Sequence, residues 1–294
     1  MNGLILIDKP SGCTSHDVVN RWRRLAGTKR VGHLGTLDPM ATGLLGILTG
    51  TATRLAPFYE RQEKTYRAEI TFGLTSDTYD AEGEVIATGA AAPSESAIRS
   101  GLEAFRGQIS QLPPPVSAKK IGGVPAYKLA RKKLPVNLKA VAVEIKNLAI
   151  HSVCTDLLGV EVTCSAGTYI RSIAHDLGQQ LGCGAILTRL RRTAIGEFSI
   201  ADARTLDELS ALTQAGDLAQ AVIPAGQLLP HLPAEHVSVA VELQIRQGRD
   251  FRTSPFVIHP GAPLVRVLSR DGELIAIGTM VVPNLYHPGT VFQE

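Results

Sequence analysis

The sequence lacks the features that mark several large protein classes. Its four cysteines, Cys13, Cys154, Cys164 and Cys183, form no CxxC pair and no zinc-ligand spacing, which indicates free thiols. No apolar run approaches the roughly 20 residues that a membrane helix needs. The opening MNGLILIDKP has no basic stretch before its short apolar run, so we expect no secretory signal and a cytoplasmic protein. GxxxxGK[ST] and GxGxxG motifs are also absent, and we expect neither a metal nor a cofactor.

The composition that remains is that of an ordinary globular protein. Of the 294 residues, 44% are hydrophobic and 19% are charged, which is enough apolar side chain for a full core. The net charge of +3 neither requires nor excludes a nucleic-acid partner, so the distribution of charge has to decide.

A change of composition near Val222, where prolines become frequent, predicts the domain organisation. Three prolines within residues 223–236 indicate a linker between a large domain, 1–222, and a small, mostly-β domain, 237–294. In the small domain a hairpin is expected to turn at Asp271–Gly272.

Helices and strands alternate without a strict βαβ rhythm, so the predicted fold class is α+β. Hydrophobic periodicity predicts strands at 3–8, 64–73, 140–150 and 157–165, and helices at 15–27, 94–107, 168–182 and 185–192. Ser15 is the expected cap of the first helix, and Cys154 and Cys164 could face each other across a hairpin.

The loop RVGHLGTLDPMATG, residues 30–43, concentrates glycine around a single acid, Asp38, with His33 five residues earlier. A tight turn fixed by an aspartate before a proline is one interpretation. The other is that glycine lets the backbone approach a bulky ligand while one carboxylate is aimed at it.

Basic residues gather in three segments around this loop. Such clusters are often solvated faces, but three that converge on one cleft would form a phosphate-tracking surface. The clusters are Arg21, Arg23, Arg24, Lys29 and Arg30; Lys119, Lys120, Lys128, Arg131, Lys132 and Lys133; and Arg189, Arg191 and Arg192.

Four motifs in a fixed order resemble those of one known family. They are GHLGTLDPMATGLL, KTYRAEITFGLTSDTYDAEGE, PPPVSAKKIGGVPAYKLAR and CSAGTYIRSIAHDLGQQLG, the last followed by LRRTAIGEF. The ordered set is similar to the tRNA pseudouridine synthase B family, which isomerises the T-loop uridine conventionally numbered 55. The resemblance implies a mixed, largely antiparallel sheet with flanking helices, a small PUA-like RNA-binding module and the tRNA T-arm as partner. A monomer is the default expectation because an RNA arm must reach the cleft, and an isomerisation without redox or phosphate chemistry requires no metal or cofactor.

The resemblance also assigns roles by motif position. Asp38 is the expected catalytic residue, Tyr66 the aromatic that stacks on the target base, and Arg171 the partner of the carboxylate. The expected substrate-binding residues are His33, Gly35, Lys64, Tyr169 and Leu190.

The chemistry of this isomerisation asks for these residue types. The base must leave the stack, and a carboxylate must act as nucleophile or base. A buried carboxylate needs a positive partner to stay ionised. A base that rotates without leaving the pocket needs an aromatic side chain to stack on. Whether Asp38 attacks C1′, attacks C6 or removes a proton to give a glycal stays open.

Structural interpretations compete with these roles. Tyr66 could be a core aromatic, Arg171 a surface ion pair and His33 an ordinary loop histidine.

Two other functions remain open: an RNA-binding protein without catalysis, and an N-glycosidase that releases free base. We interpret Asp77 and Asp80 as turn acids rather than as a glycosidase pair with Asp38, and His175 as a surface residue.

Overall fold

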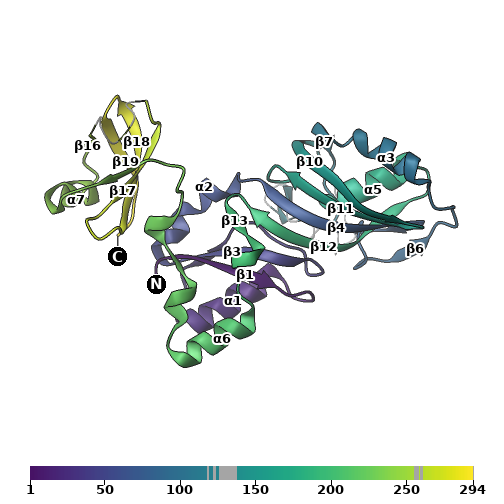
Figure 1. Ribbon diagram of the computed structural model, residues 1–294, viewed down its shortest axis with the longest axis horizontal. Coiled ribbons are helices and arrows are strands. Elements are labelled where there is room, and N and C mark those ends of the chain that lie inside the picture. The colour runs from purple at the N-terminus through teal and green to yellow at the C-terminus, as the bar shows by residue number, and fades with distance from the viewer. Residues whose placement is uncertain (118, 122–123, 126–137, 255–257, 259–260, 294) are drawn as a thin grey trace.

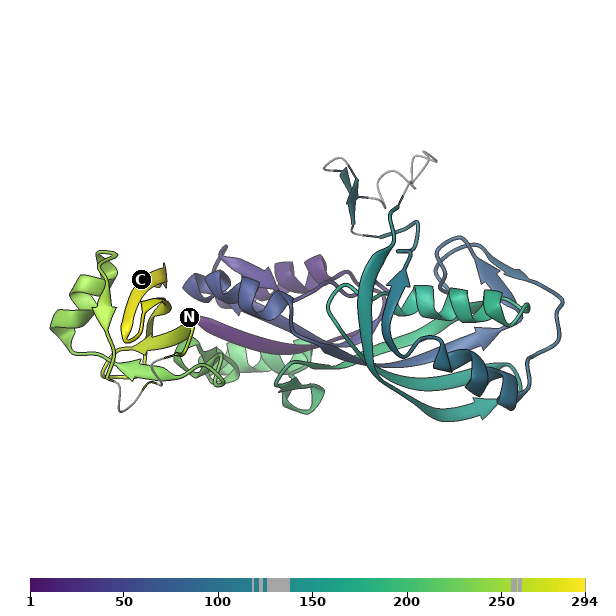
Figure 2. The ribbon, with the colours of Figure 1, turned by 90° about the horizontal axis from the view of Figure 1, so that it is seen from above.

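Two sheets dominate the chain, and the smaller one lies at one end of an elongated molecule (Figures 1 and 2). The α+β class with a mixed, largely antiparallel sheet is confirmed. No helix in the described part of the chain is long and apolar enough to span a membrane. The computed structural model describes residues 1–117, 119–121, 124–125, 138–254, 258 and 261–293.

The larger sheet has ten strands, in the order β14-β1-β3-β12-β4-β11-β10-β7, with β2 beside β3 and β13 beside β12. Its strands are β1 (Gly3–Lys9), β2 (Val31–His33), β3 (Thr42–Thr49), β4 (Lys64–Phe72), β7 (Gly107–Gln111), β10 (Val141–Cys154), β11 (Leu157–Cys164), β12 (Ala185–Ile195), β13 (Phe198–Ser199) and β14 (Ile223–Pro224).

The two halves of this sheet meet where β3 runs parallel to β12 for two residues, with Thr42 opposite Arg191 and Gly43 opposite Arg192. Gly43 has φ of +100°, and a Cβ there would lie 2.3 Å from the carbonyl oxygen of Arg192. Only glycine fits such a contact, so the glycine that ends the Asp38 loop allows the two halves to join.

Helices cover the two halves separately: α1 and α6 pack on β1 and β3, while α3 and α5 pack on the β4–β12 half (Figure 1). The helices are α1 (Ser15–Ala26), α2 (Ala56–Glu60), α3 (Glu95–Glu103), α5 (Ile170–Gln180), α6 (Leu206–Ala215) and α7 (Val239–Arg246). Short 3-10 turns are η1 (Gly50–Leu55), η2 (Ile200–Asp202), η3 (Leu218–Ala221) and η4 (Ala225–Gln227).

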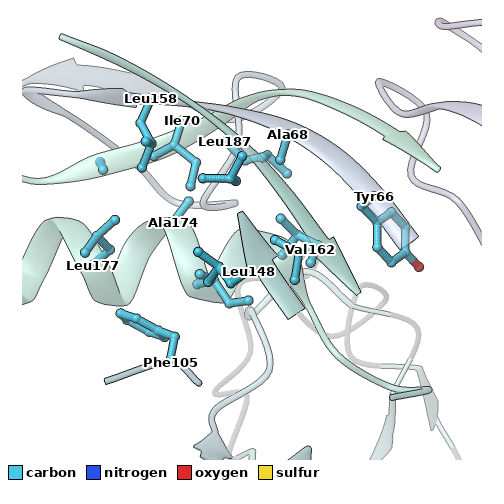
Figure 3. Close-up of a cluster of buried hydrophobic side chains, with 14 of the residues drawn as sticks. Tyr66, Ala68, Ile70, Phe105, Leu148, Leu158, Val162, Ala174, Leu177 and Leu187 are labelled. Atoms are coloured by element: carbon cyan, nitrogen blue, oxygen red, sulfur yellow. The ribbon is translucent and has the colours of Figure 1, made fainter. Parts of the chain in front are cut away.

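The core beside α5 follows from the alternation along β4. Tyr66, Ala68, Ile70 and Phe72 point to one face and are at most 9% exposed. They pack with α5 side chains such as Leu177, as Figure 3 shows. Each large side chain buried in this way stabilises the fold by about 1.5–3 kcal/mol.

The helix predicted at 185–192 is wrong, because this segment lies within strand β12. It pairs with β4 from Ala185 opposite Phe72 to Ile195 opposite Lys64, which makes it a central strand. Its apolar residues at 185–187 and 190 also fit one helical face, and only the pairing with β4 decides between the two structures.

Two local predictions are also corrected. The cap of α1 is Thr14, in a capping box with Asp17, whereas the Ser15 hydroxyl accepts from Leu37 N at 2.8 Å and so tethers the Asp38 loop. Cys154 and Cys164 do not face each other, since they pair with Leu157 and Ile145 respectively.

The segment 223–236 differs from the free linker that its prolines suggested. Ile223–Pro224 forms β14 on the edge of β1, and Leu228 and Leu229 are each 1% exposed. The Tyr59 hydroxyl accepts from Leu229 N at 2.9 Å. The segment is therefore part of a core shared by both sheets.

The smaller sheet begins inside the expected linker, because β15 already pairs with β17. Its order is β15-β17-β18-β19-β16, and β17 and β18 form the hairpin that turns at Asp271–Gly272. Its strands are β15 (Ala234–His236), β16 (Phe251–Arg252), β17 (Leu264–Leu268), β18 (Leu274–Val282) and β19 (Leu285–Val291). Two separate hairpins pair β5 (Leu74–Ser76) with β6 (Val85–Ala87), and β8 (Lys120–Ile121) with β9 (Val124–Pro125).

Candidate active site

A pocket of about 270 Å³ is lined by the Asp38 loop, the start of α5, β4 and β12. Its volume lies just below the range of about 300–1,000 Å³ that is typical of ligand sites. Every predicted site residue except His33 lines it. The lining residues are Gly35, Thr36, Leu37, Asp38, Glu60, Lys64, Tyr66, Ala166, Gly167, Thr168, Tyr169, Ile170, Arg171, Leu190 and Arg192.

The Asp38 carboxylate is held by the guanidinium of Arg171 at two points. Arg171 Nε lies 3.0 Å from Oδ2, and Nη2 donates to Oδ1 at 3.1 Å. The Arg171 side chain is 5% exposed and that of Asp38 is 34% exposed. The planar guanidinium thus fixes the orientation of the carboxylate and leaves it accessible from the pocket.

A second acid, Asp80, shares the same guanidinium. Its Oδ2 lies 3.4 Å from Arg171 Nη1, which also donates to Thr78 O at 3.0 Å. Asp80 is 2% exposed, so it is a buried member of the site and not only a turn acid. Sequence reasoning placed this residue in the turn and missed its contact with Arg171.

Burial raises the pKa of Asp38, and the nearby Asp80 charge adds to the rise, while Arg171 opposes both. An ionised Asp38 therefore depends on its arginine partner.

Lys9 holds the backbone of the Asp38 loop, a role that the sequence did not reveal. Its buried ammonium donates to the carbonyls of Pro10, Pro39 and Ala41 at 2.9, 3.2 and 2.7 Å. Burial lowers the pKa of Lys9. The only sequence signal was a lysine at the end of an apolar strand, immediately before a proline.

The start of α5 is anchored by the last residue of β7. Gln111, 1% exposed, accepts from Tyr169 N at 2.8 Å and donates to Tyr169 O at 3.0 Å. Ser172 Oγ donates to Leu112 O at 2.7 Å. These bonds fix the turn from which Arg171 projects.

Tyr66 is both a core residue and a pocket residue. It is 9% exposed and packs with the α5 cluster, while its hydroxyl points away from the apolar side chains (Figure 3). Burial raises the pKa of the Tyr66 hydroxyl, and Arg192 beside it partly opposes the rise. The structural and the functional interpretation of this tyrosine are therefore compatible.

Arg192 is a further site residue that the sequence placed only in a basic cluster. It is 1% exposed and donates to Leu44 O at 2.7 Å and to Gly35 O at 3.1 Å. It thereby ties Gly35, which has φ of +91°, to β12 beside the pocket.

Lys64, at the start of β4, also lines the pocket. Its ammonium donates to Glu60 O at 3.1 Å and to Gln62 O at 2.6 Å, and burial lowers its pKa to about 8. Arg192 adds to this lowering, so the two cations share one rim of the pocket.

Two histidines lie elsewhere than predicted. His33 sits on β2 opposite Ile47, outside the pocket lining, and its buried Nδ1 has no partner among the described residues. Burial lowers the pKa of His33. His175 is half-buried and stacked on Tyr79, so its surface assignment is wrong.

Among the described residues, Arg192 is the one member of the three basic clusters that lines the pocket. Arg189 and Arg191 line a different pocket and pair with Glu69 at 3.4 Å and Asp8 at 2.7 Å. In the middle cluster, Lys128 and residues 131–133 lie outside the described residues. Within the described residues no group of His, Cys, Asp and Glu could hold a metal ion.

Comparison with known proteins identifies the family. Residues 23–170 match the family described as TruB family pseudouridylate synthase (N terminal domain), and residues 171–230 match the one described as tRNA pseudouridylate synthase B C-terminal domain. A tRNA pseudouridine synthase B of Solibacter usitatus (strain Ellin6076) is 49% identical over 292 residues, covering 99% of this chain and 100% of the relative. The chain belongs to the TruB family of pseudouridylate synthases.

Membership of the TruB family confirms the predicted enzyme class, a pseudouridine synthase and thus an isomerase. A second relative, the tRNA pseudouridine synthase B of Geobacter sulfurreducens (strain ATCC 51573 / DSM 12127 / PCA), is 39% identical over 283 residues and covers 94% of this chain and 93% of its own.

The fold is shared more widely than the sequence. A chain in the structure of an H/ACA RNP bound to a substrate RNA containing 2'-deoxyuridine matches 99% of this chain and 85% of its own, with a TM-score of 0.72 at 24% identity.

Proposed function

We propose that this TruB family member converts uridine 55 in the T loop of tRNA to pseudouridine, with Asp38 as the catalytic residue. The observation that carries the proposal is the Asp38 carboxylate, held by two contacts from Arg171 inside the pocket. The tRNA substrate is supported by the names of the full-length relatives.

The reaction breaks the bond from C1′ to N1, turns the base and forms a bond from C1′ to C5. The uridine has to leave the stack and enter the pocket to meet Asp38. Attack at C1′, attack at C6 and proton removal toward a glycal all need an ionised carboxylate. Arg171 supports each of them equally, because it opposes the rise in the pKa of Asp38 that burial causes.

The pocket walls suggest roles for the remaining residues. Tyr66 would stack on the base, with Tyr169 and Leu190 closing the apolar side. Lys64 and Gly35 also line the pocket, where a cation and a residue without a side chain suit the sugar-phosphate of a flipped nucleotide. His33 does not line the pocket and would help to hold neighbouring extruded nucleotides.

The two sheets would have different roles. We assign catalysis to the larger sheet with its helices and RNA binding to the smaller, PUA-like sheet, with the packed segment near 223–236 joining them. The enzyme would act as a monomer, because an RNA arm must reach the pocket, and in the cytoplasm, where its tRNA substrate is found.

The proposal is tested with a tRNA transcript carrying tritium at C5 of uridine. Isomerisation exchanges the C5 hydrogen, so tritium is released while the base stays attached to the RNA. An RNA-binding protein without catalysis would release no tritium, and an N-glycosidase would liberate free uracil. Either of these outcomes would contradict the proposal.

A further inference from the structure

A second contact between α5 and the loop that carries Asp80 lies outside the pocket. The rings of Tyr79 and His175 are stacked, with centroids 3.7 Å apart and planes 8° from parallel. Both side chains are half-buried, and neither lines the pocket. We name residues 76–83, which precede β6, the Asp80 loop.

Helix α5 contacts this loop on two successive turns. Arg171 and His175 are four residues apart, so they project from the same face of the helix. Arg171 binds Thr78 O and the Asp80 carboxylate, and His175 covers the ring of Tyr79 between them. Three consecutive loop residues are thus held by one helix face.

The backbone of the loop is unusual at the residue that carries the ring. Tyr79 has φ of +65°, a left-handed conformation that is uncommon for an aromatic residue. Its carbonyl accepts from Leu187 N at 3.0 Å, and Ala81 N donates to Leu187 O at 3.1 Å. Such a conformation persists only where its surroundings hold it.

The conformation of this turn links the Tyr79–His175 stack to the contacts of Arg171. The left-handed residue lets Thr78 O on one side and the Asp80 carboxylate on the other both reach Arg171. If the Tyr79 ring lost its cover, the turn could relax toward ordinary φ values, and the two contacts behind Arg171 would loosen. Arg171 would then hold Asp38 less firmly.

We infer that the Tyr79–His175 stack is a positioning clamp for the isomerisation, which keeps the Asp80 loop in register with Arg171 and so orients Asp38. The inference rests on the proposed function, because it assigns the two rings an effect on the rate at Asp38. Neither ring touches the reacting atoms, so both are positioning residues.

The test compares variants of the full-length protein in single-turnover tritium release, with tRNA affinity measured separately by filter binding. His175→Ala removes the cover, and Tyr79→Asn removes the ring while keeping a residue that tolerates the left-handed region. His175→Phe and Tyr79→Phe keep both aromatic planes. Gln179→Ala, at an exposed position on α5, is the matched control.

We expect His175→Ala and Tyr79→Asn to lower the single-turnover rate by about tenfold or more, because small misplacements of catalytic groups are costly. Their tRNA affinity should stay near that of wild type, as should both the rate and the affinity of the Phe variants and the control. Combining Ala with Asn should cost little more than either alone, since the two rings act as one unit.

Amide hydrogen exchange at Ala81 and Leu187 adds a readout that does not depend on activity. Exchange should quicken in His175→Ala and stay near wild type in His175→Phe. A wild-type rate in His175→Ala, an equal loss in His175→Phe, a loss confined to affinity, or unchanged exchange would each overturn the clamp. A wild-type protein that releases no tritium would instead refute the proposed function, and the exchange data would still decide whether the stack holds the loop.

Discussion

Arg171 and Asp38 are 133 positions apart in the chain, yet the guanidinium of one meets the carboxylate of the other at 3.0 and 3.1 Å. The fold brings them together by placing the start of α5 beside the loop that leads into β3. The same guanidinium lies 3.4 Å from Asp80, so one buried cation contacts both the accessible Asp38 and the buried Asp80.

Substitution of Arg171 should separate charge from geometry. Arg171→Lys keeps a cation but loses the planar fork, so we expect a rate about 10²-fold lower with the pH profile unmoved. Arg171→Ala leaves Asp38 and Asp80 without their cation, which should lower the rate further. The pKa of Asp38 then rises, so the residual activity should need higher pH.

Single-turnover rates of both variants across pH check this order. Equal rates for the Lys and Ala variants would show that the fork is unimportant, and an acid limb of the Ala profile that stays in place would show that Arg171 does not control ionisation.

Asp80→Asn should move the pH profile in the opposite direction. Removing the Asp80 charge lowers the pKa of Asp38, because that charge contributes to its rise. The acid limb of the rate profile should therefore shift to lower pH. The plateau rate should fall by about tenfold or more, since Arg171 loses a contact that orients it.

Asp77→Asn is the matched control for this prediction. Asp77 is an exposed acid of the same loop that accepts from Glu84 N at 2.9 Å and has no contact with Arg171. A control that shifts as far as Asp80→Asn would assign the effect to the charge of the loop as a whole.

Tyr66 should act through its ring. Tyr66→Phe keeps the aromatic face and should retain most of the rate, whereas Tyr66→Leu should lose about tenfold or more, because stacking on one base is worth about 1–3 kcal/mol. Single-turnover tritium release compares them. Equal rates for Phe and Leu would end the stacking argument, and a large loss in Phe would point to the hydroxyl as a proton acceptor.

Truncation should show that the two sheets are not independent. A chain ending at residue 222 loses β14 and the buried pair Leu228 and Leu229, so we expect poor soluble yield or a lowered melting temperature. A chain ending at residue 232 keeps that segment and should be more soluble. Equal yield and melting of the two chains would contradict this expectation and support a free linker.

Local pattern was enough to predict much of the fold. The alternation of β4 and the 3.6-residue periodicity of α5 each identified their element and its buried face. Strand β12 was missed because its apolar residues also suit a helix, and its pairing with β4 and β3 is a tertiary fact that no local window contains.

The candidate site divides in the same way. The motifs pointed to Asp38, Tyr66 and Arg171, which carry a recognisable local sequence. Lys9 and Arg192 could not be assigned to the site, and Asp80 was interpreted as a turn acid, because each becomes part of the site only through a partner in a distant element. His175 was interpreted as a surface residue because it falls on the polar face of its helix, and its contact with Tyr79 depends on the tertiary structure.

The substitution Asp38→Asn tests the central claim most directly. The pKa of Asp38 is raised in the folded protein, so folding favours the neutral carboxyl. Protonation of Asp38 therefore stabilises the fold, and this stabilisation is lost as pH rises through the raised pKa. The neutral and nearly isosteric amide should therefore leave the fold intact at neutral pH.

The decisive measurement is single-turnover tritium release from C5-labelled tRNA by Asp38→Asn, with thermal melting and tRNA affinity measured on the same preparation. We expect wild-type melting and affinity with no detectable release of tritium. A folded Asp38→Asn protein that retains a tenth or more of the wild-type rate would contradict it.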